Sequence, residues 1–380
     1  MQSALNLNVE DFLAHYWQKK PMLIKTGFKE FEDPLSPDEL AGLALEPQVE
    51  ARRVWRAEER WHAEQGPFDS YEHLGEADWT LLVQAVNQWH PGVQELAEQF
   101  CFIPGWRFDD VMVSFSAPGG GVGPHIDQYG VFIIQGQGTR RWRVGLPQPL
   151  KQFAADGALR HCEAFVAEID EILTPGDILY IPPGCPHEGY AETPAMNYSV
   201  GFRAPDAKEL VSGFADYLLE HDIKSRRFDD PDLTPCPAHG RIDTAALSQV
   251  KSLMTELLAE PQRLADWFGE MISEAKHELA LEHAEPSYSL EELVLRLDND
   301  EPLYRLAGVR CFYMEGNAEV FYLDGDRYQL AQADAAAIAL LCDQTRICGP
   351  EVACLEHPQA LLEVLLPLVN QGYWFFDEEE

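Results

Sequence analysis

The chain has 380 residues, of which 46% are hydrophobic and 11% aromatic, so it is long enough for two or three domains with their own cores. Its 28 basic and 64 acidic residues give a formal net charge of −36, which repels phosphate backbones and argues against direct binding of nucleic acid. The eight cysteines include no Cys-x-x-Cys pair, and we find neither a signal peptide nor an apolar run of membrane-spanning length, so we expect a cytoplasmic protein without membrane contact.

Residues 1–90 are predicted to form helices and short strands that buttress a sheet. A first helix is indicated by apolar residues at helical spacing and ends before Pro21, where a short strand at 22–24 follows. Ser36 is the expected N-cap of a second helix, because Glu39 stands three residues later and completes a capping box.

Residues 91–206 change to a strand pattern. Short apolar or alternating stretches are separated by glycine and proline corners, which is typical of a jelly roll or barrel. A polar insertion at about 151–167 interrupts them. The expected strands are 111–116, 131–135, 139–144, 172–181 and 196–202.

The pattern is helical again at 207–285, where wide apolar stripes must be buried against this chain or a second copy of it, which makes them a candidate dimer interface. Residues 286–380 are predicted to form a small separate domain of helices and a hairpin with its tip at Gly325. Such a helix-and-wing arrangement often binds nucleic acid. Here five arginines and no lysine stand against 18 acidic residues, so the electrostatic requirement is not met.

The chemistry is carried by His125, Asp127 and His187. In an extended strand residues i and i+2 share a face, so His125 and Asp127 would project together, and His187 would join them from another strand 60 residues on. Two imidazoles and one carboxylate are the ligands of a facial Fe(II) site that leaves positions open for a cosubstrate and O2. By itself a His-x-Asp pair is often a chance occurrence, and a zinc hydrolase is the competing metal site. We expect the nearby Cys185 to be a small apolar filler and not a ligand.

Arg140 begins a strand 13 residues beyond Asp127, and its guanidinium could pair with the distal carboxylate of a dicarboxylic keto acid. The neighbouring Arg141 and Arg143 are expected to be solvated or paired with surface acids. Polar strand residues could complete the cosubstrate site or simply be satisfied core hydrogen-bonding groups. These are Ser114, Ser116 and Asn197.

These motifs resemble the cupin-like, JmjC-type ribosomal oxygenases, and the resemblance extends over the whole chain. It is strongest with the bacterial members, which carry arginine at the position of Arg140 where eukaryotic members carry lysine. The stretches that carry it are 125–127, Arg140, 173–187 with its Pro-Gly-Asp and Pro-Pro-Gly turns, 197–203, and shorter matches at 11–21, 212–217 and 372–376.

The resemblance implies an α+β protein with a double-stranded β-helix at 91–206, flanking helices, a helical dimerisation region at 207–285 and an acidic winged-helix-like domain at 286–380. It also implies a homodimeric enzyme that uses Fe(II), 2-oxoglutarate and O2 to hydroxylate the β-carbon of an arginine in a basic large-subunit ribosomal protein. The acidic charge would steer such a substrate.

Four residues near the metal ligands in the sequence could bind the substrate guanidinium, and these are Asp109, Asp110, Gln128 and Tyr129. Two alternatives remain at this stage. One is another JmjC oxygenase, such as a demethylase or histidyl hydroxylase. The other is a non-catalytic, ribosome-associated cupin scaffold.

Overall fold

The computed structural model describes residues 4–71, 74–157, 159–235 and 238–377, which divide into two compact units. The first unit takes in the chain up to Ala204 and the short segment Lys276–Glu278, and the second contains Pro205–Ala275 and the chain from Leu279 onward. Over these described ranges, no helix combines the length and apolar character needed to cross a membrane.

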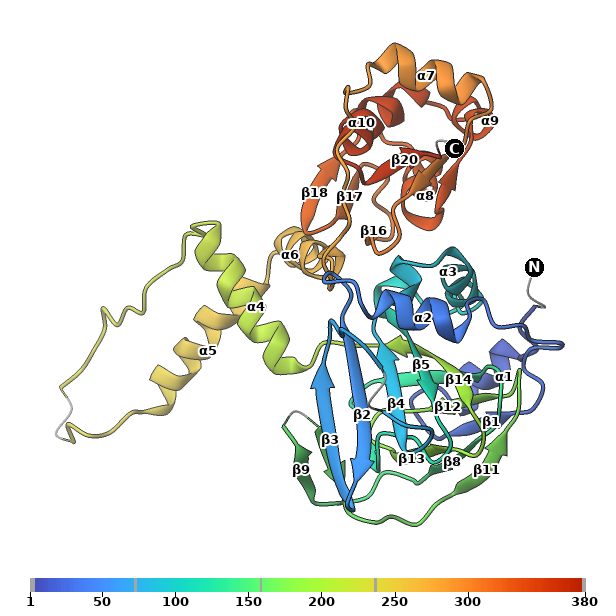
Figure 1. Cartoon of the computed structure of the whole chain (residues 1–380). Coiled ribbons are helices and arrows are strands. Elements are labelled where there is room, and N and C mark those ends of the chain that lie inside the picture. Colours follow the sequence, from blue (N-terminus) through green and yellow to red (C-terminus); the bar gives the residue numbers. More distant parts are fainter. Residues whose placement is uncertain (1–3, 72–73, 158, 236–237, 378–380) are drawn as a thin grey trace. The chain divides into compact units, whose positions relative to one another are not determined.

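The first unit is built on two antiparallel sheets and a hairpin (Figure 1). The larger sheet has the strand order β1-β12-β7-β14-β5-β4-β2-β3, and the smaller has the order β11-β8-β13-β6. The strands of the larger sheet are β1 (Met22–Ile24), β2 (Ala51–Ala57), β3 (Arg60–Gln65), β4 (Trp79–Val83), β5 (Phe108–Ser116), β7 (Gly130–Gln135), β12 (Ile178–Ile181) and β14 (Ala195–Phe202). The others are β6 (His125–Ile126), β8 (Arg140–Val144), β11 (Ile169–Leu173) and β13 (Pro186–Ala191), with the hairpin β9 (Gln152–Asp156) and β10 (Leu159–Cys162).

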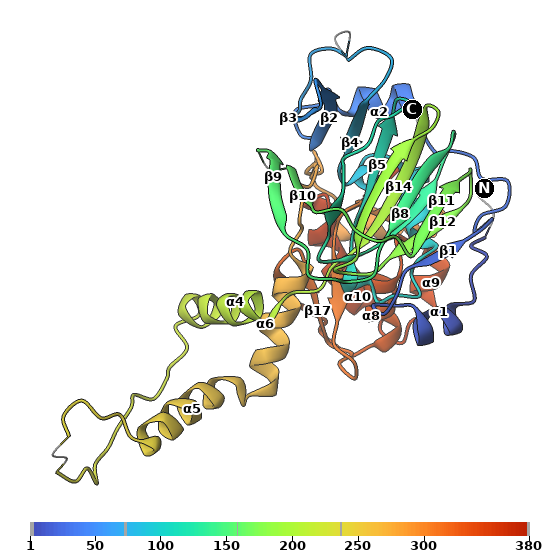
Figure 2. The ribbon, with the colours of Figure 1, turned by 90° about the horizontal axis from the view of Figure 1, so that it is seen from below.

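The continuous apolar run of β7 has a simple cause, because this strand is buried on both faces. Figure 2 shows the strands of the first unit from a second direction. Val131 and Ile133 point between the two sheets and pack with Trp142 of β8. Phe132 and Ile134 point the other way, into a core shared with the N-terminal helices. The two sheets therefore form a β-sandwich whose interior is available for a site, while its outer face is closed by helices.

Those helices are α1 (Val9–His15), α2 (Pro37–Leu43) and α3 (Pro91–Glu98), with one-turn 3-10 helices at Val86–Gln88 and Gly105–Arg107. The capping box predicted at Ser36 and Glu39 is present. The turn before β12 is held by Asp177, whose carboxylate accepts hydrogen bonds from the backbone of Thr26 and of Thr174 and pairs with Lys25. This buried carboxylate joins the end of the edge strand β1 to its neighbour β12.

Two parts of the first unit differ from the sequence expectation. The polar stretch 151–167 contains the β9–β10 hairpin, which alternation could not indicate because β9 is largely solvated. Residues 51–83 supply three long strands that extend the larger sheet past β5. β3 is the edge strand of the sheet, and the charged residues exposed on it hide its strand pattern.

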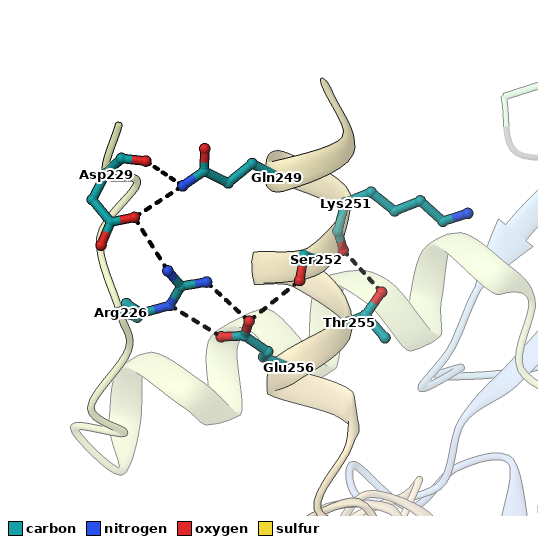
Figure 3. Close-up of polar contacts among 7 residues, drawn as sticks. All are labelled: Arg226, Asp229, Gln249, Lys251, Ser252, Thr255 and Glu256. Carbon is teal, nitrogen blue, oxygen red and sulfur yellow. Dashed lines mark hydrogen bonds and ion pairs between the residues drawn. The ribbon is translucent and has the colours of Figure 1, made fainter. Parts of the chain in front are cut away.

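The second unit begins with the helices α4 (Ala207–Glu220), α5 (Thr244–Leu258) and α6 (Pro261–Ser273). The long connection between α4 and α5 is fastened to α5 by Arg226, which lies 3.0 Å from a carboxylate oxygen of Glu256 and 3.3 Å from Asp229 (Figure 3). Gln249 also donates to Asp229. One face of α5 is thereby occupied by polar contacts.

The rest of the second unit is a helix-and-wing domain. Its helices are α7 (Leu290–Asp298), α8 (Ala335–Asp343), α9 (Gly349–Ala353) and α10 (Pro358–Asn370). Its strands are β15 (Leu303–Arg305), β16 (Cys311–Tyr313), β17 (Val320–Leu323), β18 (Asp326–Gln329), β19 (Arg346–Ile347) and β20 (Trp374–Phe376). The β17–β18 turn has Gly325 at its tip, where φ is +84°, as a hairpin glycine predicts.

Candidate active site

Three side chains that could bind a metal meet between the two sheets. His125 on β6 and His187 on β13 are directly opposite each other in the strand register, and their ring centroids are 4.1 Å apart. A carboxylate oxygen of Asp127 lies 3.7 Å from Nε2 of His125 and 3.5 Å from Nε2 of His187. Within the described ranges, these residues are the group of histidine, cysteine and acidic side chains whose donor atoms gather closely enough to hold an ion, all within 4.8 Å.

The hydrogen bonds of the two rings fix the tautomer that metal binding requires. Nδ1 of His125 lies 2.9 Å from the carbonyl oxygen of Gly123, and Nδ1 of His187 lies 3.1 Å from that of Cys185. A carbonyl only accepts, so each Nδ1 carries the proton and each Nε2 lone pair faces Asp127. Burial, together with the nearby His125, lowers the pKa of His187 to about 4. Both features suit neutral imidazole ligands.

Cys185 is almost fully buried among the apolar residues between the sheets, and it is not part of the cluster of possible ligands. Its thiol thus fills space, as the sequence suggested. A set of two neutral imidazoles and one carboxylate, with no thiolate, favours Fe(II) over a structural zinc.

Arg140 lies at the base of the same cavity and is 3% exposed. Its Nη1 donates to Oγ of Ser116 at 3.2 Å and to Oδ1 of Asn197 at 3.1 Å, while Nη2 donates to the carbonyl of Gly189 at 3.1 Å. Burial lowers the pKa of Arg140 to about 10, so the guanidinium stays charged at neutral pH. Ser114 lines the cavity beside Asn197, its partner across the β5–β14 pair.

The cavity fits an anionic cosubstrate. It has a volume of about 310 Å³ and is lined by Arg140, Trp142 and all three possible metal ligands. Two buried N–H groups here, Nε of Arg140 and Nε1 of Trp142, have no hydrogen-bond partner among the residues that the structure describes. Unsatisfied buried donors are costly, so they indicate a ligand that accepts from them, as a carboxylate would.

The neighbouring arginines behave as predicted for surface residues. Arg141 pairs with Asp170 at 2.8 Å and is half exposed, and Arg143 pairs with Glu188. Because side chains alternate along β8, Arg140 and Trp142 point inward while Arg141 and Arg143 point away.

Asp109, Asp110 and Tyr129 line the other end of the cavity. Asp110 and Ser114 are four residues apart on β5, so the acidic end lies about 13 Å along the strand from the Arg140 end. Burial, then the nearby Asp127 and the two carboxylates of β5, raises the pKa of Tyr129, so its hydroxyl stays protonated and can donate. Gln128 does not join them, because it lies in the bend between β6 and β7 and is exposed.

Sequence reasoning missed several residues of this site. Thr80 of β4 shares a hydrogen bond with Ser116, and Gln135 accepts from the amide of Asn197. Lys276 and His277 line the acidic end although they stand about 150 residues beyond the metal motif. Nothing in their local sequence pattern marks them, because only tertiary contacts bring them there.

The sandwich and the site define a JmjC-type oxygenase. Residues 95–210 match the JmjC domain family, and residues 256–375 match the ROXA-like winged helix. The predicted double-stranded β-helix core and winged-helix-like domain are therefore confirmed.

The chain is 46% identical to the ribosomal protein uL16 3-hydroxylase of Escherichia coli, over 99% of this chain and 100% of that protein. It is 33% identical to a probable ribosomal oxygenase of Haemophilus influenzae, over 71% and 69% of the two chains. The X-ray structure of E. coli ycfD superposes with a TM-score of 0.94 at 45% identity, covering 99% of this chain and 100% of that one. A structure of YcfD in complex with cobalt and 2-oxoglutarate superposes with a TM-score of 0.90 at 45% identity, covering 100% of both chains. The chain belongs to the JmjC-type ribosomal oxygenases and is a 2-oxoglutarate-dependent dioxygenase.

Proposed function

We propose that this enzyme hydroxylates the β-carbon of an arginine in the large-subunit ribosomal protein uL16. The observation that carries the proposal is one cavity with a buried cation at one end and carboxylates at the other, with the three possible metal ligands among its lining residues. The near full-length similarity to the E. coli uL16 3-hydroxylase supports the same substrate and the 3-position, which is the β-carbon.

In this proposal His125, Asp127 and His187 hold Fe(II). Arg140 pairs with the distal carboxylate of 2-oxoglutarate, and Ser116, Asn197 and Ser114 orient it or take part in the same polar network. When bound, the iron and 2-oxoglutarate supply the oxidising chemistry, in which O2 adds one oxygen atom to the substrate C–H bond and one to succinate, with release of CO2. The protein's own part is to hold these groups and to exclude water.

At the acidic end, Asp109, Asp110 and Tyr129 are proposed to receive the substrate guanidinium. Carboxylates give a guanidinium the two-pronged, charge-assisted hydrogen bonds that fix its orientation. The net charge of −36 draws a basic ribosomal protein toward this opening. A basic ribosomal protein as substrate, and the acidic charge of the chain, support a cytoplasmic enzyme that binds a protein and does not bind nucleic acid directly.

The test is incubation with iron, 2-oxoglutarate, ascorbate and either uL16 or its basic peptides. We expect a gain of one oxygen atom at an arginine, located by fragmentation mass spectrometry, with peptide-dependent formation of succinate. A peptide in which that arginine is replaced by lysine is the matched control. Absence of peptide-dependent succinate across a set of ribosomal proteins would refute the substrate assignment, and formaldehyde from a methylated peptide would indicate demethylation instead.

We also propose that the enzyme is a homodimer through α4–α6. Large apolar side chains are exposed on these helices in the single chain: Val211, Leu219, Leu247, Val250, Met254, Leu258 and Leu264. The polar contacts of Figure 3 occupy another face of α5, and its apolar residues stay exposed to solvent in the described part of a single chain.

Met254→Glu should convert the dimer to monomers in light scattering with size-exclusion chromatography. Val166→Glu is the matched control, because Val166 is equally apolar and 82% exposed but lies on the first unit. A wild-type protein that is monomeric at micromolar concentration would contradict the proposal.

A further inference from the structure

The segment Lys276–Glu278 follows α6 and belongs by its contacts to the first unit, although the residues on either side of it belong to the second. Lys276 and His277 line the active-site cavity, and all three residues line a neighbouring cavity of about 270 Å³. The segment is therefore a shared wall between the acidic end of the active site and the space beside it.

The ammonium group of Lys276 forms an ion pair with Oδ1 of Asp109. The other oxygen of Asp109 lies 3.6 Å from Nε of Arg203. His277 stands beside the next carboxylate, with its Nε2 3.9 Å from Asp110 and its Nδ1 3.8 Å from Glu50. A cation of the protein itself thus already occupies the carboxylate on which a substrate guanidinium would bind.

Of the two carboxylates proposed to receive the guanidinium, Asp110 is the less free to exchange its partners, because it already accepts hydrogen bonds from the protein. Its carboxylate accepts from the side chain of Gln84 at 2.6 Å and from the backbone of Ala85 at 2.9 Å, and the side chain is 6% exposed. Burial, and then the adjacent Asp109, raises the pKa of Asp110. Two neighbouring carboxylates in a cavity need a compensating cation. Asp109 is the carboxylate that holds such a cation, Lys276, and can exchange it for another.

We propose that Lys276 is a displaceable internal cation that fills the substrate's subsite on Asp109 until a basic substrate side chain replaces it. This proposal rests on the proposed function, because the entering cation is the substrate arginine. A neutral side chain is a poor replacement for Lys276, since Asp109 would then keep only the 3.6 Å ion pair with Arg203 beside the carboxylate of Asp110. Lys276 is thus a residue that sets the specificity for a cationic substrate.

The ion pair between Lys276 and Asp109 is more buried than an ordinary surface ion pair. The side chain of Asp109 is 16% exposed and that of Lys276 is 30% exposed, so water screens their attraction less than at an open surface. Exchange of one cation for another keeps the charge of the subsite constant, which is why binding need not meet the full cost of separating Lys276 from Asp109.

The first experiment needs no substrate. Full-length protein is treated briefly with an amine-acylating reagent, and the modification of Lys276 is measured by peptide mapping against the exposed Lys151 in the same sample. We expect Asp109→Asn to raise the relative acylation of Lys276 several-fold, because the ion pair no longer shields the amine. Equal acylation in the wild type and Asp109→Asn would overturn the proposal.

The second experiment adds the basic uL16 peptide. In the wild type, the peptide should raise acylation of Lys276, because the amine leaves Asp109. Reduced or unchanged acylation would mean that the peptide covers Lys276 or binds elsewhere, and this would overturn the proposal.

The third experiment compares Lys276→Met with the control Lys151→Met in peptide hydroxylation. Without an internal competitor, Lys276→Met should lower the KM for the basic peptide about fivefold, while Lys151→Met leaves it unchanged. An unchanged or higher KM for Lys276→Met overturns the proposal. If the wild type hydroxylates no ribosomal peptide at all, the proposed function fails, and the comparison with Asp109→Asn still decides whether Lys276 is held on this subsite.

Discussion

The role proposed for Arg140 can be tested by replacing it with methionine, which keeps most of the length but removes the charge and all N–H groups. A two-pronged pair between a guanidinium and a carboxylate contains two charge-assisted hydrogen bonds, each worth about 1.5–3 kcal/mol. Their loss, about 3–6 kcal/mol in total, corresponds to roughly 10²–10⁴-fold weaker binding of 2-oxoglutarate. Arg140→Lys keeps the positive charge but lacks the paired N–H donors of a guanidinium, so it should recover part of this loss of binding.

The measurement is the KM for 2-oxoglutarate, followed by succinate formation at saturating peptide. Arg141→Met is the matched control, because Arg141 is the next residue of β8 and pairs with Asp170 at the surface. Its KM should stay within about twofold of the wild type, since exposed ion pairs contribute little. Thermal unfolding is recorded for each variant, because Asn197 and the carbonyl of Gly189 lose a donor when Arg140 is replaced. An Arg140→Met variant that is folded and retains a wild-type KM would refute the reasoning.

Three further predictions follow from particular contacts. Asp127→Ala should lower metal affinity by more than about tenfold and abolish hydroxylation, because even the loss of a residue that only supports a metal ligand lowers metal affinity or activity about 10–100-fold. A variant that binds iron normally in a metal titration would show the ligand set to be wrong. In Gly189→Ala the new Cβ would lie 2.7 Å from the indole of Trp142, so we expect about 1–3 kcal/mol of destabilisation in chemical denaturation. Gly42→Ala, where a Cβ meets nothing within 4 Å on α2, should be neutral or stabilising. Asp177→Asn should cost about 2–4 kcal/mol of unfolding free energy at neutral pH. Burial alone would raise the pKa of Asp177, but hydrogen bonds from Thr174 and Thr26 and the pair with Lys25 outweigh it and hold the pKa below 3.8. The stabilisation is therefore complete at neutral pH and declines as the pH falls below about 4 and through the folded pKa, so the difference between Asp177→Asn and the wild type should shrink in acid. A difference that is the same at pH 3 and pH 7 would contradict the assignment.

The sequence by itself determined the candidate metal ligands and the inward-facing arginine of the site. Metal ligation restricts residue types severely, so His125, Asp127 and His187 could be recognised from their spacing and their strand context. Strand alternation also separated Arg140 from its neighbours Arg141 and Arg143, because residues one apart on a strand face opposite sides. The strong turn signals, such as Ser36 with Glu39 and Gly325, predicted local structure correctly because they depend on hydrogen bonds within a few residues.

The tertiary structure decided what surrounds that site. The register that sets His187 opposite His125 depends on how β13 pairs with β6, which no local pattern encodes. Thr80 enters through β4, whose register with β5 places it opposite Ser116, and Gln128 turns outward because the chain bends after Asp127. Lys276 reaches Asp109 across 167 positions of sequence. A lysine is an ordinary surface residue until folding places it on a partly buried carboxylate, and contacts between residues so far apart depend on the whole fold and not on the local sequence.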